Sequence, residues 1–247
     1  MNETSHAETF SMRLAQLEHA IALACRHADR KRESVRLMAV SKTHPAHAIA
    51  EAVAAGLTLF GENRVQEFEQ KSEALKSLGL ASARVHLIGH LQSNKAARAV
   101  QLFDGIDSLD SLRLAERLDE AARRLQKQLP VLLAIKLSEE STKTGLLPES
   151  PALHALLERL PDLKSLTLRG LMTIAPLTPD ATRTRACFAA LRSLRERLSR
   201  EHPRLNFEEL SMGMSGDFAL AIEEGSTCIR VGSALFGGRT QAQSEPA

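Results

Sequence analysis

Eight short apolar runs recur along the chain, and stretches with helical spacing of apolar residues lie between them. The runs cover 35–41, 57–61, 84–90, 103–109, 131–138, 166–174, 206–212 and 227–232. Most are apolar on both faces, which is typical of parallel strands covered by helices. Helices are predicted over 46–55, 63–77, 93–101, 110–129, 149–159, 180–201 and 215–224. The regular alternation indicates an α/β fold.

The number of strand–helix units predicts a single-domain (β/α)8 TIM barrel. Eight units in about 200 residues match the lower size range of this fold. The rival is an open doubly wound sheet, but no G-x-G-x-x-G motif follows the first strand. An extra amphipathic helix is predicted near 5–29, ahead of the first strand. We therefore expect an N-terminal helix and connector over 1–34, a barrel over 35–238, and a disordered tail over 239–247.

Two helices have recognisable end signals. Asp110 is placed to cap a helix whose apolar stripe contains Leu114, Leu118, Ala121 and Leu125. Ser215 is placed to cap the helix that follows the seventh strand, and Gly225 is placed to end it in the left-handed conformation.

Composition and charge exclude several function classes. The formal net charge is +2, from 32 basic and 30 acidic residues, so nucleic acid is not the expected partner. The three cysteines show no C-x-x-C spacing, which argues against a disulfide framework and a structural zinc site and favours a reducing, cytoplasmic setting. No apolar run reaches the roughly 18 to 20 residues of a membrane span, and the start lacks the order of a signal peptide. We expect no membrane association.

Histidines occur in two pairs that raise the question of a metal. His44 and His47 flank Pro45, and His86 and His90 share the third strand region. Neither pair has an acidic or cysteine partner at ligand spacing, so we expect no metal site.

A lysine directly after an apolar strand is the first candidate for chemistry. In MAVSKTHP (38–45), side-chain alternation puts Lys42 on the same face as Val40 and Met38. Active sites of barrels lie at the carboxyl ends of the strands. Lys42 therefore either has a functional role in the barrel mouth or extends to solvent at its rim. Lys136 and Lys143, in IKLSEESTKTG, are rival reactive lysines. Lys143 is expected in a loop, where a solvated role is favoured, and whether it offers a second ligand site is left open.

The loops after the seventh and eighth strands have the composition of a phosphate cradle. They read SMGMSGD (211–217) and RVGSALFG (230–237). Barrels commonly bind phosphate at these two loops, and strands 1 and 8 adjoin when a barrel closes, so the cradle would lie beside Lys42. The expected contacts are backbone amides near Gly213, Gly216, Gly232 and Ser233 with the hydroxyls of Ser211 and Ser215.

A phosphate-bearing ligand beside a reactive lysine is compatible with two chemistries. One is pyridoxal 5'-phosphate (PLP) held as an aldimine, and the other is a sugar-phosphate aldehyde bound by a cofactor-free Schiff-base aldolase. Arg230 shares a face with Cys228 on the eighth strand and is expected to point inward. A guanidinium beside the pyridine nitrogen would keep that nitrogen unprotonated and weaken the ring as an electron sink.

Together these segments resemble one family. The chain is similar, in order from about residue 35 to 237, to the pyridoxal phosphate homeostasis proteins (the YggS/PROSC-like group). The matching blocks are LMAVSKTHP with Lys42, FGENRVQE (60–67), HLIGHLQSNK (86–95), GLMTI (170–174), LSMGMSGDF (210–218) and AIEEGSTCIRVGSALFG (221–237).

The resemblance implies a barrel like the N-terminal domain of alanine racemase, with PLP bound as a covalent aldimine at Lys42. It implies phosphate contacts from Ser211, Ser215, Gly232 and Ser233, and Arg230 at the pyridine nitrogen. Asn63, His90 and Met172 are expected to line the pocket. It also implies a role in cellular PLP homeostasis, with amino acids and PLP-dependent apo-enzymes as candidate partners besides PLP itself.

The absence of tyrosine from the sequence helps to decide whether the protein is a carrier or a catalyst. Racemases of this fold use a lysine and a tyrosine on opposite faces of the substrate, whereas this chain contains no tyrosine. We therefore expect a protein that binds PLP and buffers or delivers it without robust turnover. A weak racemase or lyase that uses Lys42 with His90 or a water is the alternative, and the cofactor-free aldolase is an alternative of another class.

Overall fold

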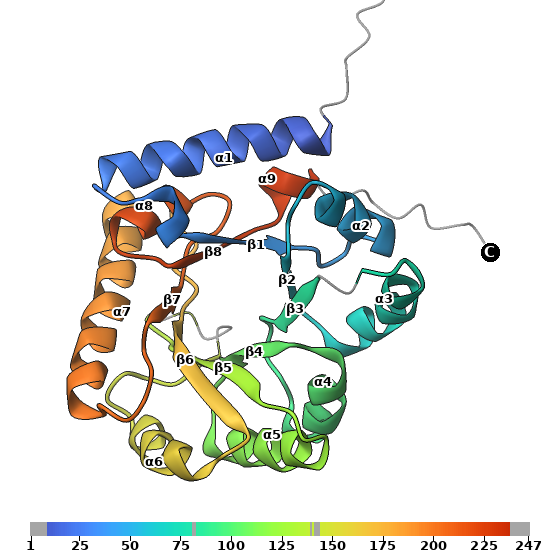
Figure 1. Ribbon diagram of the computed structural model, residues 1–247. Helices are drawn as coiled ribbons and strands as arrows, with labels where there is room; N and C mark the ends of the chain where they lie inside the picture. The colour runs from blue at the N-terminus through green and yellow to red at the C-terminus, as the bar shows by residue number, and fades with distance from the viewer. Residues whose placement is uncertain (1–8, 81–82, 139, 141–143, 238–247) are drawn as a thin grey trace, which may run out of the picture.

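The computed structural model describes residues 9–80, 83–138, 140 and 144–237. Within them, eight parallel strands pair in sequence order, and β8 pairs with β1 to close a barrel (Figure 1). The predicted (β/α)8 fold is thereby confirmed. The expected tail, 239–247, and Lys143 lie outside the described residues. The strands are β1 Arg36–Val40, β2 Leu59–Glu62, β3 Arg84–Leu87, β4 Gly105–Leu109, β5 Leu129–Ala134, β6 Leu166–Met172, β7 Glu209–Ser211 and β8 Cys228–Val231.

Helices follow the strands around the outside of the barrel (Figure 1). They agree with the predicted ranges to within a few residues, apart from the short α9 and three 3-10 turns, which were not predicted. The α-helices are α1 Phe10–His27, α2 Ala46–Ala54, α3 Val65–Ser77, α4 Ala96–Leu102, α5 Leu112–Arg124, α6 Pro151–Arg159, α7 Ala181–Glu201, α8 Phe218–Glu223 and α9 Ser233–Phe236. The 3-10 turns are η1 Arg32–Ser34, η2 Ser93–Lys95 and η3 Leu160–Asp162.

Most strands bury residues on both faces, and the two faces meet different surroundings; β3 and β6 also have exposed positions along one face. Leu37 and Ala39 of β1 belong to the large apolar cluster between barrel and helices. Leu132, Ala134 and Met172 form a separate small cluster of buried residues. Strand residues are apolar on both sides because one side packs under helices and the other fills the barrel.

The N-terminal helix braces the last helix of the barrel. Figure 1 shows α1 lying across α8 and α9, next to the β1–β8 seam. The rings of Phe10 and Phe236 have their centroids 5.5 Å apart, and the Arg13 Nε donates to the Leu235 carbonyl at 2.6 Å. Because α9 begins in the predicted phosphate cradle, this extra helix supports the candidate site from behind.

Two of the predicted helix ends differ from the structure. Ser111, not Asp110, caps α5, since the Ser111 hydroxyl accepts from the Leu114 amide at 3.3 Å. Asp217, not Ser215, precedes α8 as its N-cap residue. Gly225 does end α8 with a φ of +95°, as predicted. Both polar residues at the misassigned positions make contacts with other loops, which a local capping argument does not include.

The predicted stripe of α5 also includes one position too many. Leu125 is 48% exposed because it lies one residue beyond the end of α5.

The barrel interior holds charged residues as well as apolar ones. Arg36 forms an ion pair with Glu209, and the His86 Nδ1 lies 2.9 Å from the Asp107 Oδ1. Gly105 leaves space for the imidazole, because a Cβ at this position would lie 2.6 Å from the His86 ring. Charges inside a barrel must be paired, since isolated burial of either sign is costly.

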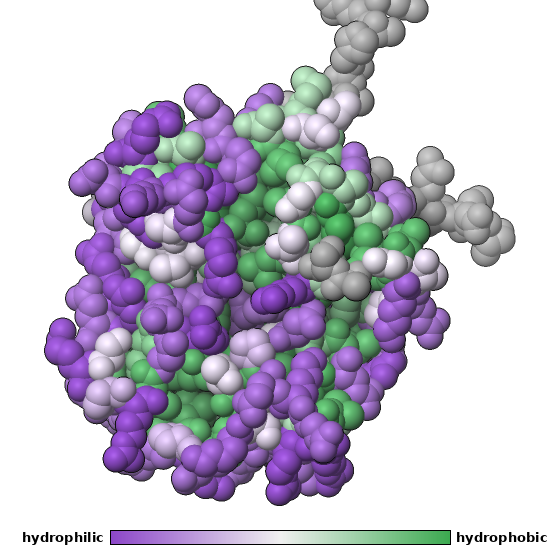
Figure 2. Space-filling view, in the orientation of Figure 1, coloured by the Kyte–Doolittle hydropathy of each residue, from purple (hydrophilic) through white to green (hydrophobic). Residues whose placement is uncertain are grey.

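Most of the surface in Figure 2 is hydrophilic, and apolar residues gather mainly near α1, α2 and α9. Among the described residues, no helix combines the length and the apolar composition that crossing a bilayer requires.

The His86–Asp107 pair predicts a specific pH dependence of stability. Burial lowers the pKa of His86, but the charge and hydrogen bond of Asp107 outweigh it, and the net shift from 6.5 is upward. The folded chain therefore holds a proton that the unfolded chain gives up, so the stabilisation is complete below 6.5 and is lost as pH rises through the folded-state pKa. Urea unfolding should show the difference between wild type and His86→Gln decreasing by up to about 1.4 kcal/mol per pH unit in this window.

The comparison with His86→Gln also removes the contributions of other groups. Burial lowers the pKa of His44, which gives the opposite slope, and this contribution is common to both proteins. A stability difference that stays constant from about pH 6 to about pH 9 would contradict the assignment.

Gly170, in β6, is a position where we expect a substitution to lower the stability of the fold strongly. Its φ is +153°, and a Cβ there would lie 1.9 Å from the Glu209 carbonyl oxygen on the neighbouring strand. Gly170→Ala should therefore lower the free energy of unfolding by about 2–4 kcal/mol. Gly216→Ala is the matched control, because no described neighbour lies within 4 Å of the position that its new methyl group would occupy. Equal unfolding midpoints for the two variants would refute the strain argument.

Candidate functional site

Lys42 lies in a tight turn at the carboxyl end of β1. The Ser41 carbonyl accepts from the His44 amide at 3.1 Å, so Lys42 and Thr43 occupy the two central positions of a hydrogen-bonded turn. Thr43 has a φ of +65°, in the left-handed region that β-branched residues avoid. Such a conformation costs on the order of 1–3 kcal/mol and persists only where surrounding contacts impose it. The turn bearing the candidate lysine is therefore held by its neighbours.

Arg230 is a buried cation without a buried anion in contact. Its side chain donates to the Ser211 hydroxyl and to the Thr173 carbonyl, both at 2.7 Å, and the residue is only 3% exposed. Among the described residues, no carboxylate lies within ion-pair distance of it. Burial lowers the pKa of Arg230, although an arginine stays protonated in proteins. This guanidinium is therefore directed toward neutral acceptors and has capacity for a further one.

The loops after β7 and β8 approach each other as predicted. The Ala234 amide, in α9, is 3.5 Å from the Ser215 hydroxyl oxygen, and Gly232 lies against Val40 of β1. Ser215 and Ser211 both act as acceptors in these bonds, so each hydroxyl keeps its proton for donation. The two loops can therefore present hydroxyl donors at the end of the barrel where Lys42 lies.

The other side of the barrel mouth contains a cavity of about 240 Å³. Three of the predicted pocket residues, Asn63, His90 and Met172, line it together. Ile174 also lines it, so the cavity lies next to Thr173, whose carbonyl binds Arg230. The predicted residues thus form two groups at one end of the barrel, with Thr173 between them.

His86 and His90 each have an acidic partner that is distant in the sequence. His90 Nδ1 lies 2.9 Å from the Asp110 Oδ2, and His86 pairs with Asp107 in the same way. Both aspartates come from β4 or the residue after it, so the sequence spacing did not reveal the pairs. Each is a single His–Asp pair, and the described residues contain no group of three metal-ligating side chains.

Lys136 and Ser138 line the same cavity, whereas the sequence offered Lys136 only as a rival reactive lysine and gave no reason to single out Ser138. The Ser138 hydroxyl oxygen is buried and has no hydrogen-bond partner in the described part of the chain. The alternation of Leu132, Ala134 and Lys136 was the available signal, because the first two side chains belong to the inner cluster. A basic and a hydroxyl group therefore face His90 in the mouth.

A second missed group lies behind Lys42. Glu62, Glu67 and Lys71 come from β2 and α3 and bond to the turn at Ser41 and Thr43. Glu62 is 0% exposed, a rare state for a carboxylate, but nothing in the local pattern pairs it with a lysine nine residues later.

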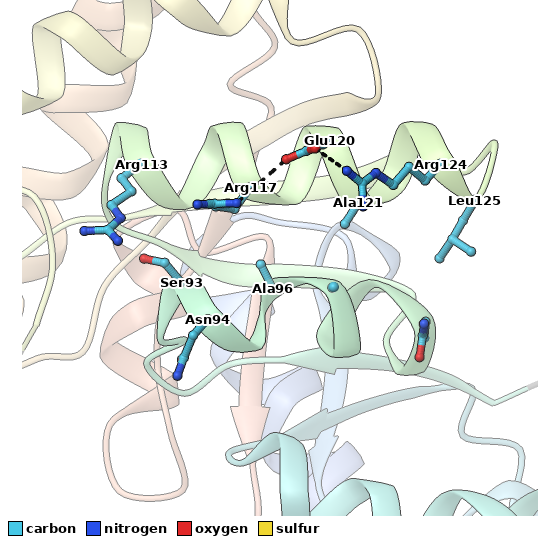
Figure 3. A pocket seen from close by; sticks show the side chains of 11 residues that line it. Ser93, Asn94, Ala96, Arg113, Arg117, Glu120, Ala121, Arg124 and Leu125 are labelled. Atoms are coloured by element: carbon cyan, nitrogen blue, oxygen red, sulfur yellow. Dashed lines mark hydrogen bonds and ion pairs between the residues drawn. The ribbon is translucent and has the colours of Figure 1, made fainter.

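A larger hollow of about 590 Å³ lies on the outer wall of the barrel. Figure 3 shows it between α5, which contributes Arg113, Arg117 and Arg124, and the start of α4. Glu120 forms ion pairs with Arg117 and Arg124. None of the predicted site residues lines this groove, so we place the candidate site at the barrel mouth and not at the larger depression.

Comparison with known proteins agrees with this geometry. The family model for the alanine racemase N-terminal domain matches residues 12–240. The pyridoxal phosphate homeostasis protein of Pasteurella multocida is 40% identical over 233 residues, covering 94% of this chain and 98% of that protein. Its counterpart from Escherichia coli K12 is 39% identical over 244 residues, covering 97% and 98%.

A solved structure is similar along nearly the whole chain. PipY of Synechococcus elongatus, in the structure with PLP bound, is 45% identical, with a TM-score of 0.82 over 93% of this chain and 100% of that one. The similarity confirms the resemblance drawn from the sequence blocks. The chain belongs to the family of pyridoxal phosphate homeostasis proteins, built on the fold of the alanine racemase N-terminal domain.

Proposed function

We propose that this protein binds PLP and acts in cellular PLP homeostasis, by holding the cofactor at Lys42 and buffering or delivering it. The relatives of similar length are named for that role, and PipY has been solved with PLP bound. One structural observation supports the proposal most strongly: Arg230 is a buried cation held by neutral acceptors at the same end of the barrel as Lys42. Such an arrangement suits a ligand that brings its own acceptor atom.

The residues present offer groups that suit the aldehyde, the phosphate and the pyridine nitrogen of PLP. Lys42 offers a primary amine, and the hydroxyls of Ser211 and Ser215 with the amides of Gly232 and Ser233 offer donors to a phosphate. The orphaned Ser138 hydroxyl gives the cavity beside Asn63, His90 and Met172 unused hydrogen-bonding capacity. When bound, PLP supplies an aldehyde that condenses with an amine and a ring that withdraws electrons.

Arg230 has donors left for the pyridine nitrogen. A guanidinium carries five N–H donors, and Ser211 and Thr173 each take one. Because Arg230 can donate a hydrogen bond but keeps its proton, it would leave a ring nitrogen unprotonated. The ring would then withdraw electrons weakly, which favours binding of the cofactor over turnover of a substrate.

Lys42 must lose its proton before its nitrogen can attack an aldehyde carbon, and one water leaves when the carbon–nitrogen double bond forms. A single lysine suffices for this condensation and for its reversal. The chain contains no tyrosine to serve as a second base on the opposite face.

A weak racemase or lyase is the second candidate function, and the His90–Asp110 pair favours it. The Asp110 Oδ2 lies 2.9 Å from the His90 Nδ1 and orients the ring, and His90 is about half exposed at the rim. Steady-state racemization or elimination of an amino acid, lost in His90→Gln, would support this function over a carrier.

The proposal extends to partners and setting. Free amino acids and PLP-dependent apo-enzymes are the proposed recipients of the cofactor. A cytoplasmic location is part of the proposal, supported by Cys25 and Cys228, which are buried free thiols.

Removal of the lysine amine tests the covalent assignment. Wild type with PLP should show an absorbance band near roughly 420 nm, and borohydride reduction should fix the adduct on the Lys42 peptide. Lys42→Ala should lose both signals while keeping its unfolding midpoint, because Lys42 lies partly exposed at the mouth. Lys136→Ala serves as the matched control, and a reduced adduct mapped to Lys136 or Lys143 would overturn the choice of Lys42.

The phosphate cradle predicts discrimination between PLP and pyridoxal, which lacks the phosphate. Replacing Ser215 by alanine should weaken PLP binding by about 10- to 100-fold, because the charge-assisted hydrogen bond from its hydroxyl is lost. Pyridoxal binding should change little, and equilibrium titration by absorbance measures both. A Ser215→Ala variant that weakens both ligands equally would show that this serine does not contact the phosphate.

A further inference from the structure

The turn that contains Lys42 is bonded from behind by an ion cluster. The Ser41 hydroxyl donates to the Glu62 Oε1 at 2.7 Å, on the side of β1 opposite to Lys42. Lys71, from α3, donates to the same Glu62 oxygen at 3.0 Å and to the Ser41 carbonyl at 3.1 Å. Lys71 therefore contacts the peptide group directly before Lys42.

Glu67 holds the peptide group directly after Lys42. Its Oε1 accepts from the Thr43 amide at 2.5 Å and from the Lys71 ammonium at 2.8 Å. Glu67 and Lys71 lie one turn apart on α3, so one helix face supplies both groups. Both peptide groups that flank Lys42 are thus fixed by Glu62, Glu67 and Lys71, which we name the α3 clamp.

The burial of the clamp makes its members interdependent. Glu62 is fully buried, and the Lys71 side chain is 11% exposed. Burial raises the pKa of Glu62, and the charge of Lys71 and the bond from Ser41 oppose that shift. Loss of Lys71 would leave two carboxylates near one another without their shared cation, so the turn could not keep its present bonds.

The clamp also accounts for the backbone conformation of Thr43. A left-handed φ at a threonine needs an external contact to maintain it, and the bond from the Thr43 amide to Glu67 is such a contact. The next residue, His44, places its ring 4.9 Å from that of Phe236 in α9. The Lys42 turn is thereby fixed on one side to α3 and on the other to the helix that begins at Ser233.

We propose that Lys71 is a positioning residue: through the α3 clamp it holds the Lys42 turn so that the lysine amine meets the aldehyde of PLP in the barrel mouth. The inference rests on the proposed function for the role of Lys42. Lys71 itself touches the backbone around Lys42 and acts only through it. A purely structural role, in which the clamp only ties α3 to the barrel, would affect stability without affecting the placement of the amine.

Lys71→Met tests this inference, with Lys76→Met as the matched control. Lys76 lies on the same helix and is exposed, so its replacement removes the same charge without touching the clamp. Two rates are measured at several pH values: formation of the band near roughly 420 nm after addition of PLP, and acylation of Lys42 by a small amine-reactive reagent in the absence of PLP, followed by peptide mass spectrometry.

In Lys71→Met, we expect the rate of PLP band formation and the rate of Lys42 acylation to change in opposite directions. Lys71→Met should slow formation of the PLP band by about 10- to 100-fold, because small displacements of a reacting group have effects of this size. Acylation of Lys42 should become faster, because a released turn exposes the amine to solvent. Lys71→Arg should restore part of both rates, since it keeps the cation.

Lys127 reports whether the fold is intact. Its ammonium donates to the Val100 and Phe103 carbonyls, so its acylation should stay slow unless the barrel opens. If Lys71→Met fails to fold, Glu67→Ala provides the same test, because it removes the acceptor of the Thr43 amide from a partly exposed position.

The two readouts separate this inference from the proposed function. No band in wild type would refute the covalent role of Lys42, while the acylation rates would still show whether the clamp fixes its turn. Rates for Lys71→Met that match those of Lys76→Met in both assays would overturn the positioning role, even if the unfolding midpoint fell.

Discussion

Closure of the barrel between β1 and β8 is the constraint on which the candidate site depends. The pairing of Ala39 with Val231 fixes how far each strand extends at the seam. It brings the turn after β1 beside Gly232 and the start of α9, although these segments lie near opposite ends of the chain. A lysine from the first strand and donors from the last two loops meet only because the sheet has no edge.

The charged residues of the barrel differ in whether they have a counter-ion, and this difference indicates which of them serve a ligand. Arg36, whose side chain is 50% exposed, pairs with Glu209, and His86 pairs with Asp107, so each of these charges has a counter-ion. Arg230 is buried too, but its hydrogen bonds go to a hydroxyl and a carbonyl. Since burying a charge without a counter-ion is costly, its persistence at the mouth is better explained by a bound ligand than by stability alone.

Under the proposed function, the same site would hold a reactive aldehyde. Arg230 would keep the ring a weak electron sink, and the chain has no tyrosine to move a second proton. What remains is a lysine on a strained turn, held by neighbours on α3 and α9. Contacts from neighbouring elements maintain the strained turn and so keep the Lys42 amine in place. A fixed amine would assist specific and reversible binding of an aldehyde.

Local patterns in the sequence determined the strands, most of the helices and the positions of Lys42 and Arg230, because side-chain alternation and helical spacing act over a few residues. Those patterns could also have identified Lys136 as inward-facing, from its place two residues after Ala134. Only the tertiary structure decided which polar groups became partners. Asp110 binds His90 instead of capping α5, and Lys71 reaches the turn at Ser41, since strand closure and helix docking choose partners that are distant in sequence. The sequence thus determined which residues are candidates for the chemistry, and packing determined which neighbours contact them.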